Sequence, residues 1–167
     1  ACKVDVRVTP LTDPGRWNRM GTDEVEFYLS PNPGEDLKPL ARIASGGELS
    51  RVMLAIRTLA PPEAGRTLVF DEVDAGIGGE AADAVGAHLQ KLAQKAQVIC
   101  ITHLPQIAAR GGSHIRLTKQ VHGGRTVTSA QRLDHSNRAG EIARMIAGVE
   151  VSEVVLASAR ALLRARG

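Results

Sequence analysis

Two short, continuous apolar runs, residues 67–70 and 97–101, constrain the fold of this chain more than any other feature. Apolar runs of this length are typical of strands that are covered on both faces of a parallel sheet. The segment between them, residues 80–96, carries apolar residues at helical spacing. The order strand, helix, strand therefore predicts an α/β fold with a parallel-sheet core. The helix residues expected to face inward are Ala81, Val85, Leu89 and Leu92.

The segments before this core predict two further strands and one more helix. Residues 3–8 and 23–30 both place apolar side chains at every second position, which favours half-buried strands. A helix is expected from Gly47, and the two prolines of residues 61–62 would end it. The apolar positions at helical spacing are Leu49, Val52, Met53, Ile56 and Leu59.

The segments after the core predict a hairpin and two helices. Polar and apolar residues alternate on either side of a Gly123-Gly124 turn, which indicates a two-stranded hairpin. Ser136-Asn137 can cap a helix that ends at Gly148, and Ser152 can cap a last helix. Because no repeat or low-complexity segment interrupts the chain, residues 1–167 are expected to form one structural unit.

Composition narrows the functions that such a chain could have. Aromatic residues make up 2% of the sequence, which argues against a single-strand nucleic-acid binder with base-stacking platforms. A net charge of +3 permits an acidic partner without requiring one. No apolar run approaches the ~18 residues of a membrane span. Cys2 and Cys100 show no metal or redox spacing, so reduced thiols and a cytoplasmic location are expected.

Residues 45–51, Ser-Gly-Gly-Glu-Leu-Ser-Arg, place two glycines at the expected start of a helix. A helix N-terminus offers unpaired N–H groups and a positive dipole, and glycines let a ligand approach the backbone. The segment therefore predicts a phosphate-binding site. The alternative is an ordinary helix start, with Ser45 as N-cap and Glu48 as its capping-box partner. The heptapeptide alone does not separate the two interpretations.

Polar residues follow both strands of the expected parallel sheet. Asp71-Glu72 follows the first strand and Thr102-His103 the second, and ligands of open α/β sheets bind at these carboxyl ends. Mg²⁺ often takes only one or two protein carboxylates, so Asp71 could hold the metal while Glu72 orients or deprotonates a water. The alternative is a pair of solvated loop carboxylates and a structural histidine.

In this order the motifs resemble those of ABC-type ATPases. Residues 45–51 resemble the signature motif, residues 67–72 the Walker B strand, residues 74–79 the D-loop, and His103 the switch histidine. The chain is similar to the structural-maintenance-of-chromosomes (SMC) branch rather than to transporters, because Val73-Asp74 replaces the Pro-Thr that usually follows the Walker B glutamate in transporters.

Within that branch the chain most resembles the RecN family of bacterial DNA-repair proteins, over about Asp23 to Leu163. The resemblance implies the C-terminal half of an ATPase head, separated by a long coiled coil from the N-terminal half that carries the Walker A loop. No Gly-x-x-x-x-Gly-Lys-Ser/Thr motif occurs in residues 1–167, so the chain alone is expected to hydrolyse no ATP. The runs that carry the resemblance are residues 23–34, 44–51, 102–108 and 139–145.

The resemblance also implies roles for individual residues toward an ATP held by the N-terminal half. Asp71 would hold Mg²⁺, directly or through a water, Glu72 would act on the attacking water, and His103 would contact the γ-phosphate. The signature residues would instead meet the γ-phosphate of an ATP held by a second head, so that ATP joins two heads in a homodimer. Asp74 would line the seam between them. The signature residues in question are Ser45, Gly46, Gly47 and Glu48.

DNA, double-stranded or at broken ends, is the further partner that the resemblance implies, with a nucleoid-associated location. On the expected hairpin, Arg116, Lys119 and Arg125 could form a basic patch, or else a solvated face. Two other functions stay open. One is the head of another SMC-like chromosome-maintenance or repair ATPase, and the other is a non-catalytic DNA-binding or docking module.

Overall fold

The computed structural model describes residues 3–30, 34–42, 46–60 and 65–166. The chain divides into two compact units, Ala1–Leu49 and Ser50–Gly167. The boundary falls inside helix α1 (Gly46–Leu59) rather than in a linker. The expectation that residues 1–167 form one structural unit stays a prediction.

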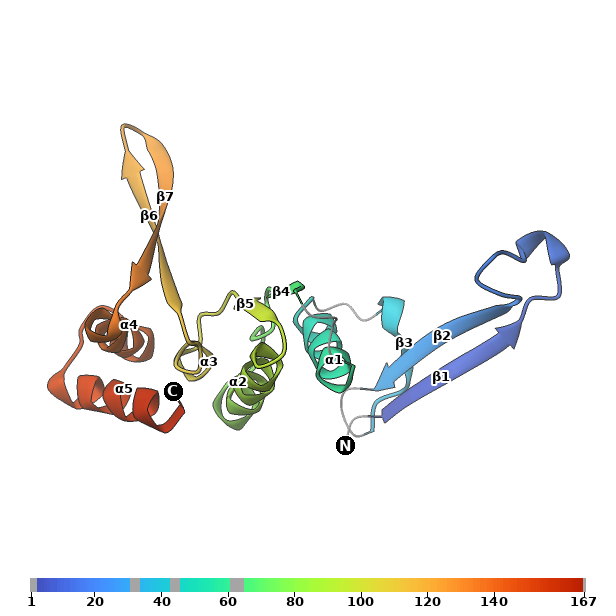
Figure 1. Ribbon diagram of the computed structural model, residues 1–167, viewed down its shortest axis with the longest axis horizontal. Helices are drawn as coiled ribbons and strands as arrows, with labels where there is room; N and C mark the ends of the chain where they lie inside the picture. The colour runs from blue at the N-terminus through green and yellow to red at the C-terminus, as the bar shows by residue number, and fades with distance from the viewer. Residues whose placement is uncertain (1–2, 31–33, 43–45, 61–64, 167) are drawn as a thin grey trace. The chain divides into compact units, whose positions relative to one another are not determined.

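An antiparallel sheet forms most of the first unit (Figure 1). Strands β1 (Lys3–Pro10) and β2 (Asp23–Ser30) pair along their whole length, which confirms both predicted strands. A short strand, β3 (Lys38–Pro39), pairs with β2. Two single turns of 3₁₀ helix, Pro14–Arg16 and Leu40–Arg42, follow β1 and β3.

One face of the β1–β2 sheet is apolar and largely open. Alternate residues of a strand point to the same side, so three apolar cross-strand pairs share this face. Of these side chains only Leu29 is buried, and the other five are 49–68% exposed. The expected half-burial of the two strands is therefore not reached. The pairs are Val4–Leu29, Val6–Phe27 and Val8–Val25.

The second unit contains the predicted βαβ core. Strands β4 (Thr67–Phe70) and β5 (Gln97–Cys100) pair in parallel, and helix α2 (Gly79–Ala93) connects them. Leu89 and Leu92 are buried and Val85 packs against the core, as predicted, whereas Ala81 is exposed and the neighbouring Ala82 is buried instead. The core comprises Leu54, Phe70, Val73, Leu89, Leu92 and Ile107.

Two predicted apolar faces of this core are only partly buried. Side chains of β4 and β5 that point toward α2 pack in the core, whereas Val69, Ile99 and Ile101 are 63%, 47% and 49% exposed. The prediction that both faces of these strands are covered is therefore wrong for the described chain. On α1, Leu54 is buried and Val52 is partly buried, whereas the other four residues of the predicted face are exposed. The open residues are Leu49, Met53, Ile56 and Leu59.

A hairpin and two helices complete the second unit (Figure 1). The hairpin of β6 (His114–His122) and β7 (Arg125–Leu133) turns at two glycines, as predicted. Helices α4 (His135–Ala147) and α5 (Glu153–Arg166) pack through Ile142, Ala143 and Ala159, together with residues near the short helix α3 (Pro105–Ala108).

The caps of these two helices differ from the prediction at one end. Asp134, not Ser136-Asn137, is the N-cap of α4, and its Oδ1 accepts a 2.8 Å hydrogen bond from the Asn137 N–H. Gly148 ends α4 as expected, with φ of +82°. The Val155 N–H donates to Ser152 Oγ at 3.4 Å, so Ser152 caps α5 as predicted. No helix in the described residues is long and apolar enough to span a membrane.

Glu141 joins the hairpin to α4. Its side chain is 5% exposed, receives two hydrogen bonds from Arg144 at 3.0 and 2.6 Å, and lies 3.5 Å from Arg116 Nη1 on β6. Burial alone would raise the pKa of Glu141, but the two guanidinium groups outweigh burial and lower it. Folding therefore favours the ionised form of Glu141 over its protonated form.

Replacing Glu141 by Gln is expected to lower the free energy of unfolding by about 1–3 kcal/mol at pH 7, because charge-assisted hydrogen bonds are lost. Since the folded pKa lies below the unfolded value of 4.5, this stabilisation is present above that pH and disappears as pH falls through the folded pKa. Urea denaturation at pH 7 and in acid measures the difference. Glu150→Gln, at an exposed position between the helices, is the control. An equal effect at both pH values would contradict the expectation.

Candidate functional site

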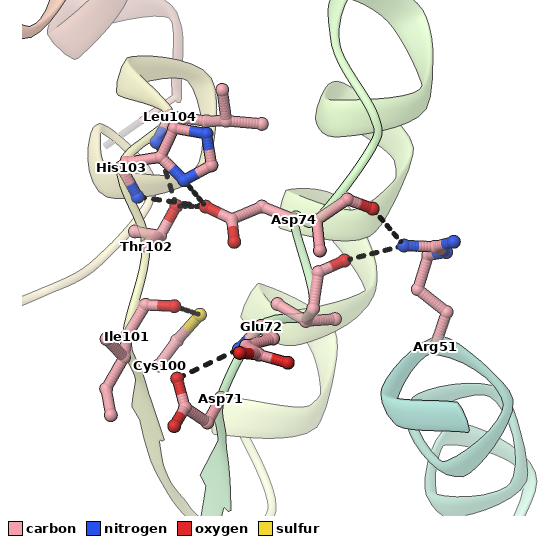
Figure 2. Close-up of polar contacts among 11 residues, drawn as sticks. Arg51, Asp71, Glu72, Asp74, Cys100, Ile101, Thr102, His103 and Leu104 are labelled. Carbon is pink, nitrogen blue, oxygen red and sulfur yellow. Dashed lines mark hydrogen bonds and ion pairs between the residues drawn. The ribbon is translucent and has the colours of Figure 1, made fainter. Parts of the chain in front are cut away.

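The carboxyl ends of β4 and β5 lie side by side and bring the predicted polar residues together. The Ile101 N–H donates to the Phe70 carbonyl at 2.9 Å, which continues the parallel pairing beyond the strands. Asp71-Glu72 and Thr102-His103 therefore leave the same end of the sheet (Figure 2). This placement is the one that the sequence predicted.

Asp71 presents an exposed carboxylate directly after β4. Its Oδ1 accepts a 2.9 Å hydrogen bond from the Glu72 N–H (Figure 2). Among the described residues, no group of three or more His, Cys, Asp or Glu side chains is placed to hold a metal ion. Mg²⁺ commonly keeps several waters and binds one or two carboxylates plus phosphates. An exposed single carboxylate at this position fits Mg²⁺ better than a metal that needs a full protein cage.

Glu72 has a left-handed backbone conformation, with φ of +55°, and no other non-glycine residue in the described chain has positive φ. Two hydrogen bonds hold it: its N–H donates to Asp71 Oδ1, and its carbonyl accepts from the Ala75 N–H at 3.0 Å. Side chains rarely adopt this backbone conformation, and such strain is found mainly at functional sites. Its carboxylate is exposed.

Asp74 is buried, with a side chain that is 4% exposed, and it faces the start of the loop after β5 (Figure 2). Its Oδ2 accepts hydrogen bonds from Thr102 Oγ1 at 2.6 Å and from the His103 N–H at 2.9 Å, and lies 3.0 Å from His103 Nδ1. Burial would raise the pKa of Asp74, but these hydrogen bonds and the nearby imidazole outweigh it and lower the pKa. The carboxylate points into its own chain, and the implied place of Asp74 at a seam between heads stays a prediction.

His103 and Thr102 differ in exposure although they are adjacent. The His103 side chain is 73% exposed, so its ring is open to a ligand. Thr102 is partly buried, and its Oγ1 also accepts a 3.0 Å hydrogen bond from the Leu104 N–H. The sequence motifs assign no role to Thr102. The available signal was a hydroxyl residue directly before His103, in a chain whose preceding strand is followed by a loop with an acidic residue.

Two residues from the end of the segment 45–51 also contact the loop after β4. Ser50 Oγ donates to the Asp71 carbonyl at 2.9 Å. Arg51 Nη1 donates to the Ala75 carbonyl at 2.8 Å and to the Val73 carbonyl at 3.4 Å (Figure 2). Helix α1 is therefore fastened to the backbone that carries the acidic residues. Sequence reasoning did not anticipate these bonds, since they depend on tertiary contact.

The remaining predicted site residues lie at the start of α1. The helix begins at Gly46, as the two glycines indicated, and Gly47 and Glu48 are in its first turn. These three residues fall in the first unit, whereas the acidic residues and His103 fall in the second. Ser45 lies outside the described residues.

Cys100 lies on β5 beside this site. It is partly buried against the core, as expected for a small apolar side chain. Burial, with a smaller contribution from Asp74 and Asp71, raises the pKa of the thiol to about 12. The thiol therefore stays protonated at neutral pH and is a poor nucleophile.

The hairpin cations do not form the single basic patch that was considered. Side chains alternate between the two faces of a strand, so Lys119 lies on the face opposite Arg116. Arg125 pairs with His122 and shares the face of Arg116. Arg116 itself contacts Glu141 and donates to Gln131 at 3.4 Å. The alternative of a solvated hairpin surface agrees better with this arrangement.

Comparison with known proteins identifies the family. No family model matches the chain. The DNA repair protein RecN of Treponema pallidum is 53% identical over 146 residues, which cover 87% of this chain and 26% of that protein. The chain belongs to the RecN family. It spans about a quarter of the length of the curated RecN relatives that it matches.

Similarity to solved structures identifies the fold. An Smc head domain with a coiled coil and joint from Pyrococcus yayanosii matches with a TM-score of 0.56 at 22% identity, over 83% of this chain and 25% of that chain. A chain from a study of ATP-driven dimerization and DNA-stimulated activation of SMC ATPases matches with a TM-score of 0.51 at 22% identity, over 88% and 83% of the two chains. The fold of this RecN-family chain is thus that of the C-terminal part of an SMC-type ATPase head.

Proposed function

We propose that the chain is the C-terminal half of the ATP-binding and ATP-hydrolysing head of a RecN-type protein that acts in DNA double-strand-break repair and recombination. The observation that carries this proposal is the meeting of Asp71, Glu72 and His103 at one end of the β4–β5 sheet. RecN-family membership supports the repair role and makes another SMC-like ATPase the weaker alternative.

The partner that completes the head would be the N-terminal half of the same protein, which carries the Walker A loop. Parallel sheets are normally covered on both faces, whereas Val69, Ile99 and Ile101 leave one face of β4–β5 open. A second layer from the N-terminal half would cover these side chains. It would also bring the phosphate cradle to the end of the sheet where Asp71 lies.

Each residue at this end has a distinct part in the proposed hydrolysis. Asp71 would hold Mg²⁺, which when bound neutralises charge on the phosphates. The Glu72 carboxylate accepts a proton from the attacking water, and the exposed His103 ring forms a hydrogen bond with the γ-phosphate. Ser50 and Arg51 hold the intervening backbone in place through its carbonyls.

The start of α1 would serve a second ATP. Its backbone N–H groups and dipole suit an anion, and the exposed Gly46 leaves room for close approach. We propose that Ser45, Gly46, Gly47 and Glu48 bind the γ-phosphate of an ATP held by another head, so that ATP links two heads. The similarity to an SMC ATPase studied for ATP-driven dimerization supports this proposal.

Dimerisation tests the role of the signature residues. In the full-length protein, Ser45→Arg is expected to prevent ATP-dependent dimerisation, because a bulky side chain would block the backbone donors at the helix start. Sedimentation velocity with and without ATP measures the change. Ser158→Arg adds the same side chain at an exposed position of α5 and is expected to dimerise normally. ATP-dependent dimers of the Ser45 variant at wild-type affinity would rule out this role.

DNA is the proposed partner of the whole protein, and binding to DNA would place it at the bacterial nucleoid. This part of the proposal rests on similarity to DNA repair proteins RecN. The hairpin residues Arg116, Lys119 and Arg125 do not support it, since they are divided between two faces and Arg116 pairs with Glu141.

A further inference from the structure

One buried oxygen atom gathers three polar groups from the loop that carries the switch histidine. Asp74 Oδ2 accepts from the Thr102 hydroxyl at 2.6 Å and from the His103 N–H at 2.9 Å, and lies 3.0 Å from His103 Nδ1 (Figure 2). The Asp74 side chain is 4% exposed and the His103 side chain is 73% exposed. The Asp74 side of the contact is therefore enclosed by protein, whereas the His103 ring is open to solvent.

The three contacts act on different degrees of freedom of His103. The hydrogen bond to the backbone N–H places the Cα of the residue, and the contact to Nδ1 sets the rotation of the ring. The Thr102 hydroxyl donates to Asp74 and accepts from the Leu104 N–H at 3.0 Å, so it ties the carboxylate to the next turn of the chain. Backbone and ring are thus held by the same carboxylate.

We propose that Asp74 is the positioning residue for His103: the ionised carboxylate accepts a hydrogen bond from Nδ1–H and thereby directs Nε2 of the exposed ring toward the γ-phosphate. This inference rests on the proposed function, in which His103 contacts that phosphate. It differs from the role that the family resemblance gave Asp74 at a seam between heads. Thr102 supports the arrangement by holding Asp74.

The tautomer has a chemical consequence. A carboxylate is an acceptor only, so the proton of a neutral His103 ring resides on Nδ1 and Nε2 is left as an acceptor. The ring donates a hydrogen bond to a phosphate oxygen through Nε2 only when that nitrogen is protonated as well. The positive charge of the ring is then balanced by Asp74. Loss of the Asp74 charge would therefore weaken the interaction of His103 with phosphate, although the packing around Asp74 and His103 would not change.

A double-mutant cycle in the full-length protein tests this relation. Asp74→Asn is expected to lower kcat for ATP hydrolysis by about 10–100-fold, the loss typical when the carboxylate partner of a metal-bound histidine is changed, with little change in KM. Adding Asp74→Asn to His103→Ala is expected to cause no further loss, because Asp74 acts through His103. Asp134→Asn is the matched control, since asparagine caps a helix as well as aspartate does, and it should keep wild-type kcat.

Three further measurements make the result decisive. Thr102→Ser should keep wild-type kcat because the hydroxyl is retained, whereas Thr102→Val should resemble Asp74→Asn. Histidine ¹⁵N chemical shifts of the full-length protein, assigned with the His103→Ala variant, should show Nδ1–H in the wild type. Thermal melting checks that each variant is folded.

Additive losses in the double variant, or a wild-type His103 protonated on Nε2 alone, would overturn the positioning role. Absence of ATP turnover in the wild-type protein would instead overturn the proposed function. In that event the ¹⁵N shifts still decide whether Asp74 sets the tautomer of His103.

Discussion

Replacing Glu72 by Gln in the full-length protein is expected to lower kcat for ATP hydrolysis by about 10²–10⁴-fold, the usual effect of losing a general base. Glutamine has nearly the same shape as glutamate but cannot accept the proton of the attacking water. ATP binding should persist, because Asp71, His103 and the start of α1 are unchanged. Phosphate release under saturating ATP measures kcat, and equilibrium binding of a fluorescent ATP analogue measures affinity.

The control for this variant is Glu80→Gln, an exposed glutamate in the first turn of α2. It makes the same chemical change one loop away and should retain wild-type kcat. The Glu72 variant should also accumulate ATP-bound dimers, because ATP stays intact between the heads. If its kcat equals that of the wild type, Glu72 has no part in the chemistry and the water must be activated by another group.

The isolated 167-residue chain is expected to show no Mg²⁺-dependent ATP turnover, whereas addition of the N-terminal half as a separate chain should restore it. The chain lacks a Walker A motif, whose glycine-rich backbone and lysine bind the phosphates of ATP. A single-turnover assay with labelled ATP measures hydrolysis by the chain, by the N-terminal half and by their mixture. Turnover by the chain alone would contradict the expectation.

The same assay separates the ATPase from a non-catalytic docking module. Mixing the N-terminal half with the Glu72→Gln chain is the matched control, since this chain should still associate but not hydrolyse. A mixture that binds ATP without any hydrolysis, although the two halves associate, would favour the docking module. Hydrolysis that depends on Glu72 would place catalysis in the shared site.

The strands, helices and hairpin were largely predictable from the sequence because local patterns determine them. The apolar runs of β4 and β5, the glycine turn of the hairpin and the glycines at the start of α1 each correspond to an observed element. The positions of Asp71 and His103 followed from the order of these elements, since parallel strands carry their ligands at the same end. Motif spacing therefore located the candidate site before any tertiary contact was known.

Burial and hydrogen bonding were less predictable because they depend on contacts between segments that are far apart in the sequence. An apolar pattern reports which side chains favour burial, and it cannot tell that Val69 and Ile99 are exposed in the part of the chain that the structure describes. The inward turn of Asp74 toward Thr102 depends on the distance between two loops that are far apart in sequence. The left-handed backbone of Glu72 is equally hidden, because glutamate gives no local sign of positive φ.

Two requirements conflict at residue 72. Its backbone conformation disfavours glutamate, whereas the proposed hydrolysis needs the glutamate carboxylate. At φ of +55°, glycine would relax the chain, and asparagine or aspartate would tolerate it better than glutamate does. A sequence selected for folding alone would therefore not keep glutamate here. Stability-driven redesign of this chain would tend to erase the carboxylate first, and a library selected only for thermal tolerance should be screened for activity at residue 72 before any other position.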